Sequence, residues 1–366
     1  MTSMIINLNL GLRSYRIVVE SGALDTVGAR LAELRVGSRA ALVSDAAVLR
    51  LYGKTVGRSL ESAGFVVATV EVPEGEAAKT LAVAARCWDA LLAAGLDRTS
   101  TVLALGGGAV GDVAGFVAAT YMRGVNFVQL PTTVLAQVDA AIGGKTAIDH
   151  PTAKNLIGAF HQPCLVICDP AIMLMLLLCE FESGLAEIVK HGVVLDADYF
   201  TEVERDAAAL CARDLPVVER IVGGSCRLKA GVVERDERES ELRHALNYGH
   251  TIGHALEAAT GYARFAHGEA VALGIVAEAR LALRLGVATQ QTVLRQERLL
   301  AALGLPVRAP AIDADRVLAA MTRDKKARDG RVPFVLAPRI GAFQLQYDVP
   351  GTSSAPSSES SDRSRC

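Results

Sequence analysis

Short runs of β-branched and other apolar residues alternate with Ala- and Leu-rich stretches throughout the first half of the chain. This alternation constrains the fold most, because strands separated by helices pair into a largely parallel sheet with helices on both faces. We expect strands over 5–10, 14–20, 39–45, 65–72, 100–107, 126–131 and 164–170, and helices over 24–34, 48–63, 79–94 and 110–121. The first half is therefore predicted to be an α/β domain over residues 1–178.

The pattern changes after residue 170. From about 180 to 330 the chain is rich in Ala, Leu, Glu and Arg at helical spacing, and little of it resembles a strand. Helices are expected over 182–194, 216–235, 242–260, 268–285 and 290–303, with a candidate late strand over 334–338. We predict an all-helical domain over 179–350, followed by a disordered Ser-rich tail over 351–366.

Charge and apolar content exclude two classes of protein. The 366 residues carry 38 Lys and Arg against 40 Asp and Glu, a formal charge of −2, which argues against a dedicated nucleic-acid binder. The longest apolar run, 170–179, is too short for a membrane-spanning helix, which needs about 20 residues. Seven irregularly spaced cysteines without a CxxC pair, and an N-terminus without signal-peptide character, favour reduced thiols in a cytoplasmic protein.

A glycine-rich segment, TVLALGGGAVGDVAG, is the strongest local feature of the first half. A predicted strand runs into Gly106, Gly107 and Gly108, and a predicted helix follows with Gly111 and Asp112. Small residues before a helix N-terminus allow a phosphate to approach the backbone amides. The G-x-G-x-x-G pattern is literal, but it lies outside the first strand–helix unit and no acidic residue follows about 20 positions later. A tight strand–helix turn remains the alternative.

Other polar residues near predicted strand ends are candidates for anion or nucleotide contacts. Asp45 ends a strand, where a carboxylate either binds a ribose diol or caps a helix. Glu76 and Lys79 lie in a polar turn that, taken alone, is typical of a helix cap. The middle of the chain adds further polar candidates: Arg123, Thr132, Thr133, Asp139, Lys145, Lys154 and Asn155. Since Glu is absent from 77 to 179, we predict a basic pocket that faces an anionic ligand.

The second half contains residues with metal-ligand spacing. Glu187 lies on a predicted helix with Lys190 at i+3, His250 and His254 are spaced i, i+4, and His267 opens the next helix. One carboxylate with two or three imidazoles suits Zn²⁺ with an open coordination position. A surface pair or a buried, hydrogen-bonded pair of histidines is the alternative. HEXXH is absent, so nothing supports a zinc protease.

A polar stripe precedes the histidine pair. Arg243 and Asn247 are spaced i, i+4, and His250 follows three residues later, as on one face of a helix that binds a polyol or a carboxylate. Further polar candidates on either side are Lys229, Glu239, Lys325 and Lys326, the last two in a segment that is equally typical of an exposed turn.

Taken together, the motifs resemble the 3-dehydroquinate synthases, which are sugar-phosphate cyclases. The resemblance covers about 5–345 and rests on LGGGAVGDVAGFVAATYMRG, QLPTTVLAQVDAAIGGKTAIDHPTAKNLIGAFHQP, SGLAEIVKHG, DERESELRHALNYGHTIGHALE, HGEAVALG and RDKK, in that order. It implies a Rossmann-like NAD-binding domain followed by a helical metal-binding domain, in a homodimer. It also implies conversion of 3-deoxy-D-arabino-heptulosonate 7-phosphate to 3-dehydroquinate and phosphate in the shikimate pathway, using NAD⁺ and Zn²⁺ or Co²⁺.

The same resemblance implies a role for each matched residue. Glu187, His250 and His267 match the metal ligands, and His254 and Glu239 the proton-transfer residues. Further catalytic groups match Lys145, Lys190 and Arg243. Substrate contacts match Arg123, Asp139, Asn155, Lys229, Asn247, Lys325 and Lys326. Cofactor contacts match Asp45, Glu76, Lys79, Gly107, Gly108, Ala109, Asp112, Thr132, Thr133, Lys145 and Lys154.

Two departures from the family pattern affect the cofactor site. MLMLLLCEF over 173–181 replaces a usual Leu-Pro turn, which puts contacts around 172–175 and Ser183 in doubt, and Ala47 replaces a frequent Asn. A cyclase acting on sedoheptulose 7-phosphate or an amino analogue, a polyol dehydrogenase of the same fold and an inactive scaffold remain alternatives. Arg243 and Asn247 favour a carboxylated substrate.

Overall fold

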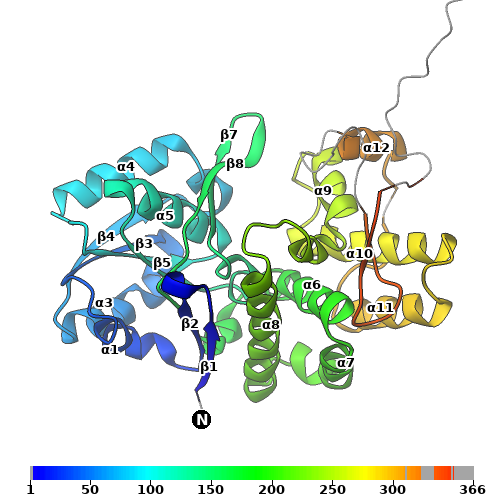
Figure 1. Ribbon diagram of the computed structural model, residues 1–366, viewed down its shortest axis with the longest axis horizontal. Coiled ribbons are helices and arrows are strands. Elements are labelled where there is room, and N and C mark those ends of the chain that lie inside the picture. Colours follow the sequence, from blue (N-terminus) through cyan, green and yellow to red (C-terminus); the bar gives the residue numbers. More distant parts are fainter. Residues whose placement is uncertain (1–2, 310, 323–333, 348, 350–366) are drawn as a thin grey trace, which may run out of the picture.

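The computed structural model describes residues 3–309, 311–322, 334–347 and 349. Lys325, Lys326 and the proposed tail over 351–366 lie outside the described residues. Seven strands form one sheet in the order β1-β2-β9-β6-β5-β3-β4 (Figure 1). They are β1 (Met4–Leu8), β2 (Tyr15–Val19), β3 (Arg39–Asp45), β4 (Val66–Val72), β5 (Thr101–Gly106), β6 (Asn126–Pro131) and β9 (Leu165–Cys168). All neighbours pair in parallel except β1 and β2, which confirms the predicted sheet.

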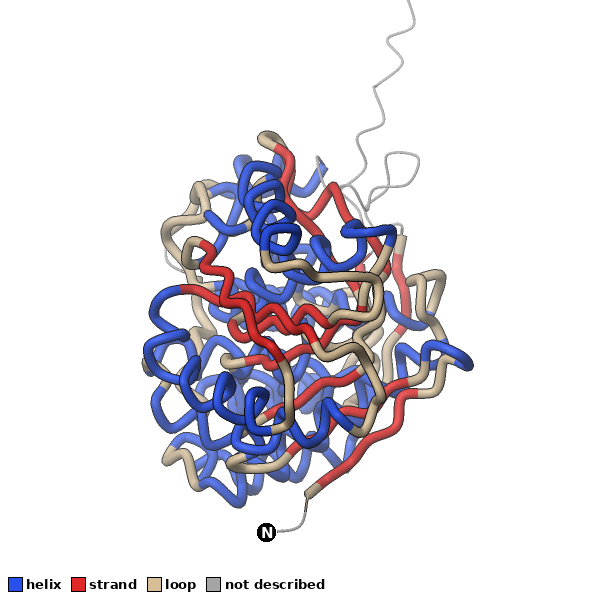
Figure 2. Tube along the Cα trace, turned by 90° about the vertical axis from the view of Figure 1, so that its left-hand side faces the viewer, coloured by secondary structure: helices blue, strands red, loops and turns tan. Residues whose placement is uncertain are grey.

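Helices cover both faces of this sheet because its central strands are apolar on both faces (Figures 1 and 2). On β5, Leu103 and Leu105 pack toward α1 (Val27–Ala32) and α3 (Lys54–Ser62). The intervening Val102 and Ala104 pack toward α4 (Leu81–Ala93) and α5 (Gly108–Thr120). The expected helix over 48–63 is split into α2 (Ala46–Val48), a π-helical turn (Leu49–Gly53) and α3.

The strand order creates a crevice at a defined place. From β3 the chain crosses to β4 on one side and then returns to β5 on the other side of β3. Ligands of open α/β sheets bind at such a switch point, beside the carboxyl ends of the strands. Here those ends are Asp45 of β3 and Gly106 of β5. The fold therefore brings two of the predicted cofactor segments to the same edge.

Helices dominate the second half, and α8 (Leu215–Arg235) packs against β1 and β2 of the sheet. The helices are α6 (Leu178–Leu195), α7 (Ala197–Cys211), α8 (Leu215–Arg235), α9 (His250–Ala259), α10 (His267–Arg284), α11 (Gln290–Ala302) and α12 (Ala314–Thr322). One apolar core joins α6, α7, α8 and α10 to side chains of β1, β2 and β9. The predicted helical domain is confirmed, and the candidate late strand over 334–338 is present as β10 (Phe334–Leu336), which pairs antiparallel with β11 (Gln344–Gln346). Within the described residues, no helix is long and apolar enough to cross a membrane.

Two segments differ from the sequence-based expectation and both shape the site. The polar stretch after α5 contains a hairpin of β7 (Lys145–His150) and β8 (Ala153–Phe160) that projects beside the sheet (Figure 1). The expected helix over 242–260 is broken into a 3-10 helix (Leu242–Asn247) and α9. Gly249 lies between them at φ 77°, and a Cβ there would be 2.6 Å from Ile275. Arg243, Asn247 and His250 therefore do not share one continuous helix.

Candidate active site

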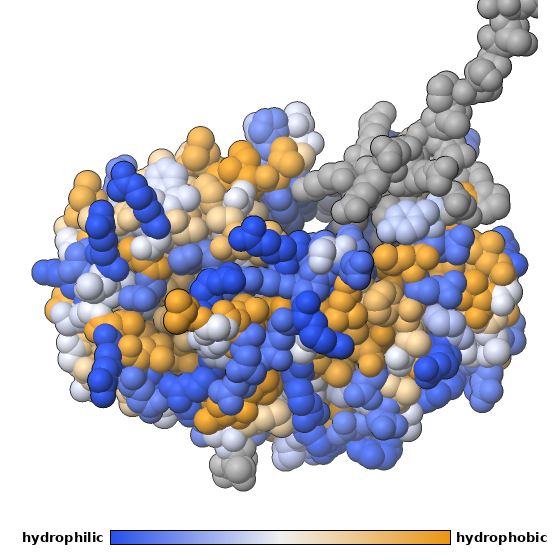
Figure 3. Space-filling view, in the orientation of Figure 1, coloured by the Kyte–Doolittle hydropathy of each residue, from blue (hydrophilic) through white to orange (hydrophobic). Residues whose placement is uncertain are grey.

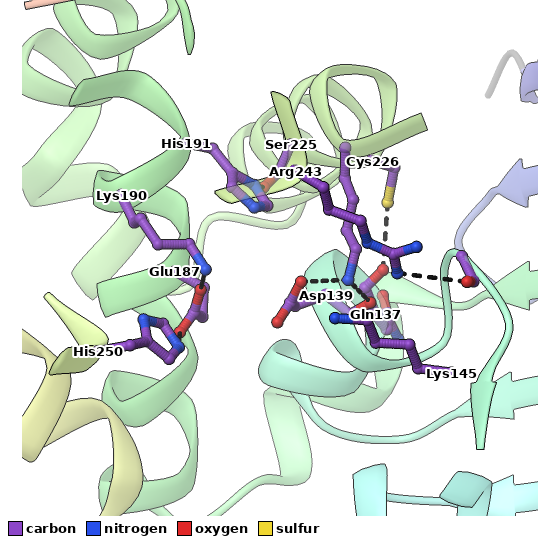
Figure 4. Close-up of polar contacts among 12 residues, drawn as sticks. Gln137, Asp139, Lys145, Glu187, Lys190, His191, Ser225, Cys226, Arg243 and His250 are labelled. Carbon is purple, nitrogen blue, oxygen red and sulfur yellow. Dashed lines mark hydrogen bonds and ion pairs between the residues drawn. The ribbon is translucent and has the colours of Figure 1, made fainter. Parts of the chain in front are cut away.

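Three predicted ligands meet where α6, α9 and α10 converge. Glu187 is fully buried within α6, and the histidines are the first residues of α9 and α10. Glu187 Oε1 lies 3.4 Å from His250 Nε2 and 3.8 Å from His267 Nε2. Lys190, one turn along α6, forms an ion pair with the other carboxylate oxygen (Figure 4). Donors from three elements thus face a common point.

The spacing of these donors suits a metal ion. Ligand atoms about 2.1 Å from a tetrahedral Zn²⁺ lie about 3.4 Å apart, close to the separations found here. The Glu187 carboxylate is fully buried, and its neighbours are the Lys190 ammonium and the two imidazoles. Burial opposes its charge, but Lys190 and His250 hold the pKa of Glu187 below its usual range. An ionised carboxylate beside two imidazoles is the donor set of a divalent cation.

A second layer of contacts orients the imidazoles. His250 Nδ1 lies 3.1 Å from the Tyr248 carbonyl oxygen, and His267 Nδ1 lies 3.4 Å from Glu257 Oε1. Such partners direct the other ring nitrogen toward a metal. Burial opposes the charge of His267, but its contacts with Glu187 and Glu257 raise its pKa to about 10. A cation that binds here therefore displaces a proton from His267.

His254 lies beside the proposed ligands. Its ring centroid is 5.2 Å from that of His250 and 6.0 Å from that of His267. Donor atoms of His254, Glu257 and His267 also lie within 4.8 Å of one another. His254 is thus close enough to act either as a proton-transfer group or as an additional ligand.

A buried ion pair lies across the site from Glu187. Lys229 of α8 donates to both the carboxylate and the backbone carbonyl of Asp139, which lies in a π-helical turn after β6 (Figure 4). Burial lowers the pKa of Lys229 to about 8 despite the attraction of Asp139. Burial opposes the charge of Asp139, but Lys229 and Lys190 hold its pKa well below its usual range. Arg243 is also buried, and it donates to the carbonyl oxygens of Glu237 and Gly143.

Glu239 joins two other candidates at the edge of the site. Its carboxylate forms an ion pair with Lys145 of β7 and accepts a hydrogen bond from Asn247 Nδ2 at 3.0 Å. Lys145 and Glu239 are 94 positions apart in sequence, so the fold brings them together. Hydrophilic side chains gather between the α/β half and the helical half, along the middle of the face in Figure 3.

The glycine-rich turn is shaped by contacts that a side chain would block. A Cβ at Gly106 would lie 2.6 Å from Val110, and one at Gly111 would lie 2.9 Å from Gln129. Gly107 is the N-cap of α5, so the amides of Gly108 and Ala109 begin a helix of 13 residues. Thr132 donates its amide to the Gly106 carbonyl at 2.9 Å, which joins the ends of β5 and β6. The turn therefore offers a small, rigid site for an anion.

Lys79 contacts several polar residues, among them the predicted cofactor residues Glu76 and Asp112. It is buried, and its ammonium lies 2.8 Å from Asp112, 3.8 Å from Glu76 and 3.9 Å from Asp149. It also donates to Asn155, which is predicted as a substrate contact and lies here beside the cofactor candidates. Lys154 lies 3.8 Å from Glu76, and its ammonium is 4.2 Å from the ring centre of Tyr262, beyond α9. The β7–β8 hairpin thus reaches toward the helical half.

Some predicted residues have other roles or lie apart. Asp45 caps α2 through the Val48 amide at 2.9 Å, so its ribose contact stays a prediction. Thr133 similarly accepts from the Ala136 amide at 3.1 Å. Arg123 is exposed, and among the described residues its side chain makes no hydrogen bond or ion pair. Ser183 accepts from the Gly268 amide at 2.9 Å, which connects α6 to the start of α10.

The cations of the expected basic pocket are paired with carboxylates in this structure. Lys79 faces Asp112, Lys145 faces Glu239 and Lys229 faces Asp139. The region without Glu contains Asp residues that balance its cations, and Glu239 comes from the other half. An anionic ligand must therefore compete with existing ion pairs instead of entering a uniformly positive pocket.

His191 and Ser225 were missed by the sequence analysis. His191 is fully buried on α6, and its Nδ1 lies 2.6 Å from Ser225 Oγ on α8. Burial and Lys190 lower the pKa of His191 to about 3. The sequence did contain a signal for His191, because it is four residues after Glu187 and hence lies on the same face of the helix.

Two protein-family models match consecutive parts of the chain that contain these site residues. The family model for the N-terminal part of 3-dehydroquinate synthase matches residues 69–183, and that for the C-terminal part matches residues 184–327. The chain belongs to the 3-dehydroquinate synthase family. This confirms the resemblance seen in the sequence and identifies the molecule as a member of a family of phosphate-eliminating lyases.

Relatives of the 3-dehydroquinate synthase family match almost the whole chain. The curated 3-dehydroquinate synthase of Geobacter metallireducens is 50% identical over 93% of this chain and 94% of its own. That of Microcystis aeruginosa is 47% identical over 95% of both chains. A solved 2-epi-5-epi-valiolone synthase of Streptomyces hygroscopicus subsp. jinggangensis 5008, with NAD⁺ and Zn²⁺ bound, aligns with a TM-score of 0.84 at 30% identity, over 93% and 94% of the two chains. The fold is therefore that of the sugar-phosphate cyclases.

Proposed function

We propose that this chain converts 3-deoxy-D-arabino-heptulosonate 7-phosphate to 3-dehydroquinate and phosphate. One observation carries the proposal: the buried carboxylate–imidazole set of Glu187, His250 and His267 lies close to the Lys190 ammonium and to the Asp139–Lys229 ion pair. Identity of 47–50% to curated 3-dehydroquinate synthases supports the same reaction. The product precedes chorismate and the aromatic amino acids in the shikimate pathway.

We further propose NAD⁺ and a divalent metal, Zn²⁺ or Co²⁺, as cofactors. Glu187, His250 and His267 would hold the metal, which would polarise a substrate oxygen. The α5 N-terminus and the end of β3 would hold NAD⁺, which supplies a reversible hydride acceptor. The NAD⁺ and Zn²⁺ of the 2-epi-5-epi-valiolone synthase support this assignment.

The chain's own residues would bind and orient the anionic substrate. Lys229 and Lys145 lie in ion pairs that can exchange a carboxylate for a phosphate or carboxylate of the substrate. Arg243 is fixed by two backbone carbonyls, so its guanidinium is held in place before substrate binds. Lys190 would stabilise negative charge on a substrate oxygen beside Glu187. His254 and Glu239 are the side chains proposed to hold and move protons.

Other features of the proposed enzyme follow from the family. We propose a cytoplasmic homodimer, with residues 1–178 as the NAD-binding domain and 179–350 as the domain that binds metal and substrate. The start of α6 at Leu178 agrees with that division. The remaining site residues keep the roles given by the resemblance, Arg123 among them.

Two substrates distinguish this function from that of a related cyclase. We expect phosphate release from the heptulosonate phosphate with a kcat/KM at least about tenfold above that for sedoheptulose 7-phosphate. The reason is that the buried Arg243 would pair with the carboxylate that only the first substrate has, and a charged hydrogen bond contributes about 1.5–3 kcal/mol. Initial rates of phosphate release measure both constants. A preference for sedoheptulose 7-phosphate would contradict the proposal.

The low pKa of Lys229 predicts an alkaline loss of activity. As the pH rises through about 8 the ammonium loses its proton, so the attraction for an anionic substrate is lost and kcat/KM should fall. Replacing Lys229 by Arg, which stays charged far above that range, should move the alkaline limb upward. Rate profiles from pH 6 to 10 test this. An identical limb in both proteins would assign the titration to another group.

A further inference from the structure

A buried polar atom in the site has no assigned role. Among the described residues, His191 Nε2 has no hydrogen-bond partner, although the side chain is fully buried. Its other ring nitrogen is fixed by Ser225 Oγ at 2.6 Å, so the ring cannot turn freely to satisfy both nitrogens. Leaving a buried donor or acceptor without a partner costs about 1–3 kcal/mol. In a native protein such an atom calls for an explanation, and a functional contact is one of them.

The surroundings of His191 indicate where that atom acts. A ring nitrogen of His191 lies within 4.8 Å of one carboxylate oxygen of Glu187 and one of Asp139. His191 therefore lies close to both Glu187 and Asp139, which are drawn on either side of it in Figure 4. The charged groups nearest to it are Lys190, Lys229, Asp139 and Glu187.

A second metal ion does not fit this position. Glu187 already belongs to the proposed metal site, and Asp139 is in an ion pair with Lys229. A cation between them would face two buried ammonium groups, which repel it. A phosphate or carboxylate would choose these ammonium groups over a neutral imidazole. A hydroxyl group fits best, because it can donate to an imidazole nitrogen or accept from it, whichever tautomer is present.

We propose that His191 Nε2 hydrogen-bonds a hydroxyl group of the polyhydroxylated substrate, between the metal site and Asp139. Ser225 is then a positioning residue, since it holds the ring from the helix α8 side. The inference rests on the proposed function and adds a substrate contact to it. His191 lies one residue after Lys190, so α6 presents a metal ligand, a cation and a hydroxyl-binding group within its central turns.

Two substitutions separate substrate contact from structural support. In His191→Asn the amide can reach the position of Nδ1 and keep the Ser225 contact, but nothing reaches the position of Nε2. In His191→Gln the longer side chain places an amide near Nε2. We measure kcat and KM for the heptulosonate phosphate on the NAD- and metal-loaded proteins, together with metal content and Tm. The third variant, Ser225→Ala, loosens the ring without removing it.

The proposal predicts a ranking of these proteins. His191→Asn should lose about 3–10-fold in kcat/KM, chiefly through KM, the range expected for one hydrogen bond. His191→Gln should recover most of that loss, and Ser225→Ala should lose less than the Asn variant. Metal content should match the wild type in all three. An Asn variant with wild-type KM, or one that is more active than the Gln variant, would overturn the proposal.

Failure of the proposed function would be visible separately. If the wild-type protein releases phosphate only from sedoheptulose 7-phosphate, the proposed function fails. The Asn and Gln variants are then ranked with that substrate, which also carries several hydroxyl groups. The same ranking would support the His191 contact, and the reverse ranking would overturn it.

Discussion

Replacing His250 by Ala is expected to remove the metal from the purified protein and to reduce phosphate release by more than about a hundredfold. Replacing a residue that only hydrogen-bonds to a metal ligand already costs about 10–100-fold in metal affinity or activity. His250 is proposed as a direct ligand, so its loss should cost more. Its Nε2 lies 3.4 Å from Glu187, so its removal leaves the carboxylate with one imidazole of the proposed three-residue set. Elemental analysis after dialysis gives the metal content per chain.

Two controls make this result specific. His150→Ala removes an exposed imidazole on the β7–β8 hairpin and should leave the metal content unchanged. Glu187→Gln keeps the shape of the carboxylate and removes its charge, so it should lose metal as His250→Ala does. Full metal occupancy in His250→Ala with an unchanged Tm would show that His250 is not a ligand.

Replacing Gly274 by Ala is expected to destabilise the protein by about 3 kcal/mol and to weaken metal binding. A Cβ at Gly274 would lie 1.9 Å from the carbonyl oxygen of Gly249, which belongs to the turn before His250. Because backbone cannot yield as a flexible side chain does, α9 and α10 must move apart, and overpacking of this kind costs about 1–3 kcal/mol or more. His250 and His267 start these two helices, so their spacing changes as well.

Gly231→Ala is the matched control for this substitution. It lies on α8, where a Cβ would meet no atom within 4 Å, so it should be neutral or slightly stabilising because Ala favours the helix. Chemical denaturation gives the free energy of unfolding of both variants. Equal stabilities and equal metal affinities would mean that α9 and α10 do not pack as closely as the structure shows.

The parallel sheet could be predicted because its strands are buried on both faces. Val102 to Leu105 are apolar without a break. A short unbroken apolar run between turn residues is typical of a strand that is buried on both faces. The glycine-rich turn could be placed for the same reason, since it directly follows this strand. The hairpin of β7 and β8 was missed because its apolar residues stand next to one another instead of alternating with polar ones, and much of β8 is exposed. Such a strand lacks the apolar alternation that identifies one.

The site could be predicted as a set of residues but not as an arrangement. Helical spacing continues unbroken from Arg243 to His254, and the break at Gly249 follows from its packing against Ile275, which no local pattern reveals. The ion pairs were also invisible in sequence. Glu239 and Lys145 lie in different halves, so their contact depends on how the two halves pack. The sequence alone therefore did not reveal that the cations expected to face an anionic ligand are paired with carboxylates.

The most direct test of the proposed reaction follows phosphate and NADH together in one reaction mixture. The heptulosonate phosphate is added to the metal-loaded protein with catalytic NAD⁺, while phosphate is assayed and absorbance at 340 nm is recorded. The proposed reaction is redox-neutral overall, so many equivalents of phosphate should appear per NAD⁺ without accumulation of NADH. NADH that accumulates in step with substrate consumption, without phosphate release, would contradict the proposed reaction and indicate a simple dehydrogenase.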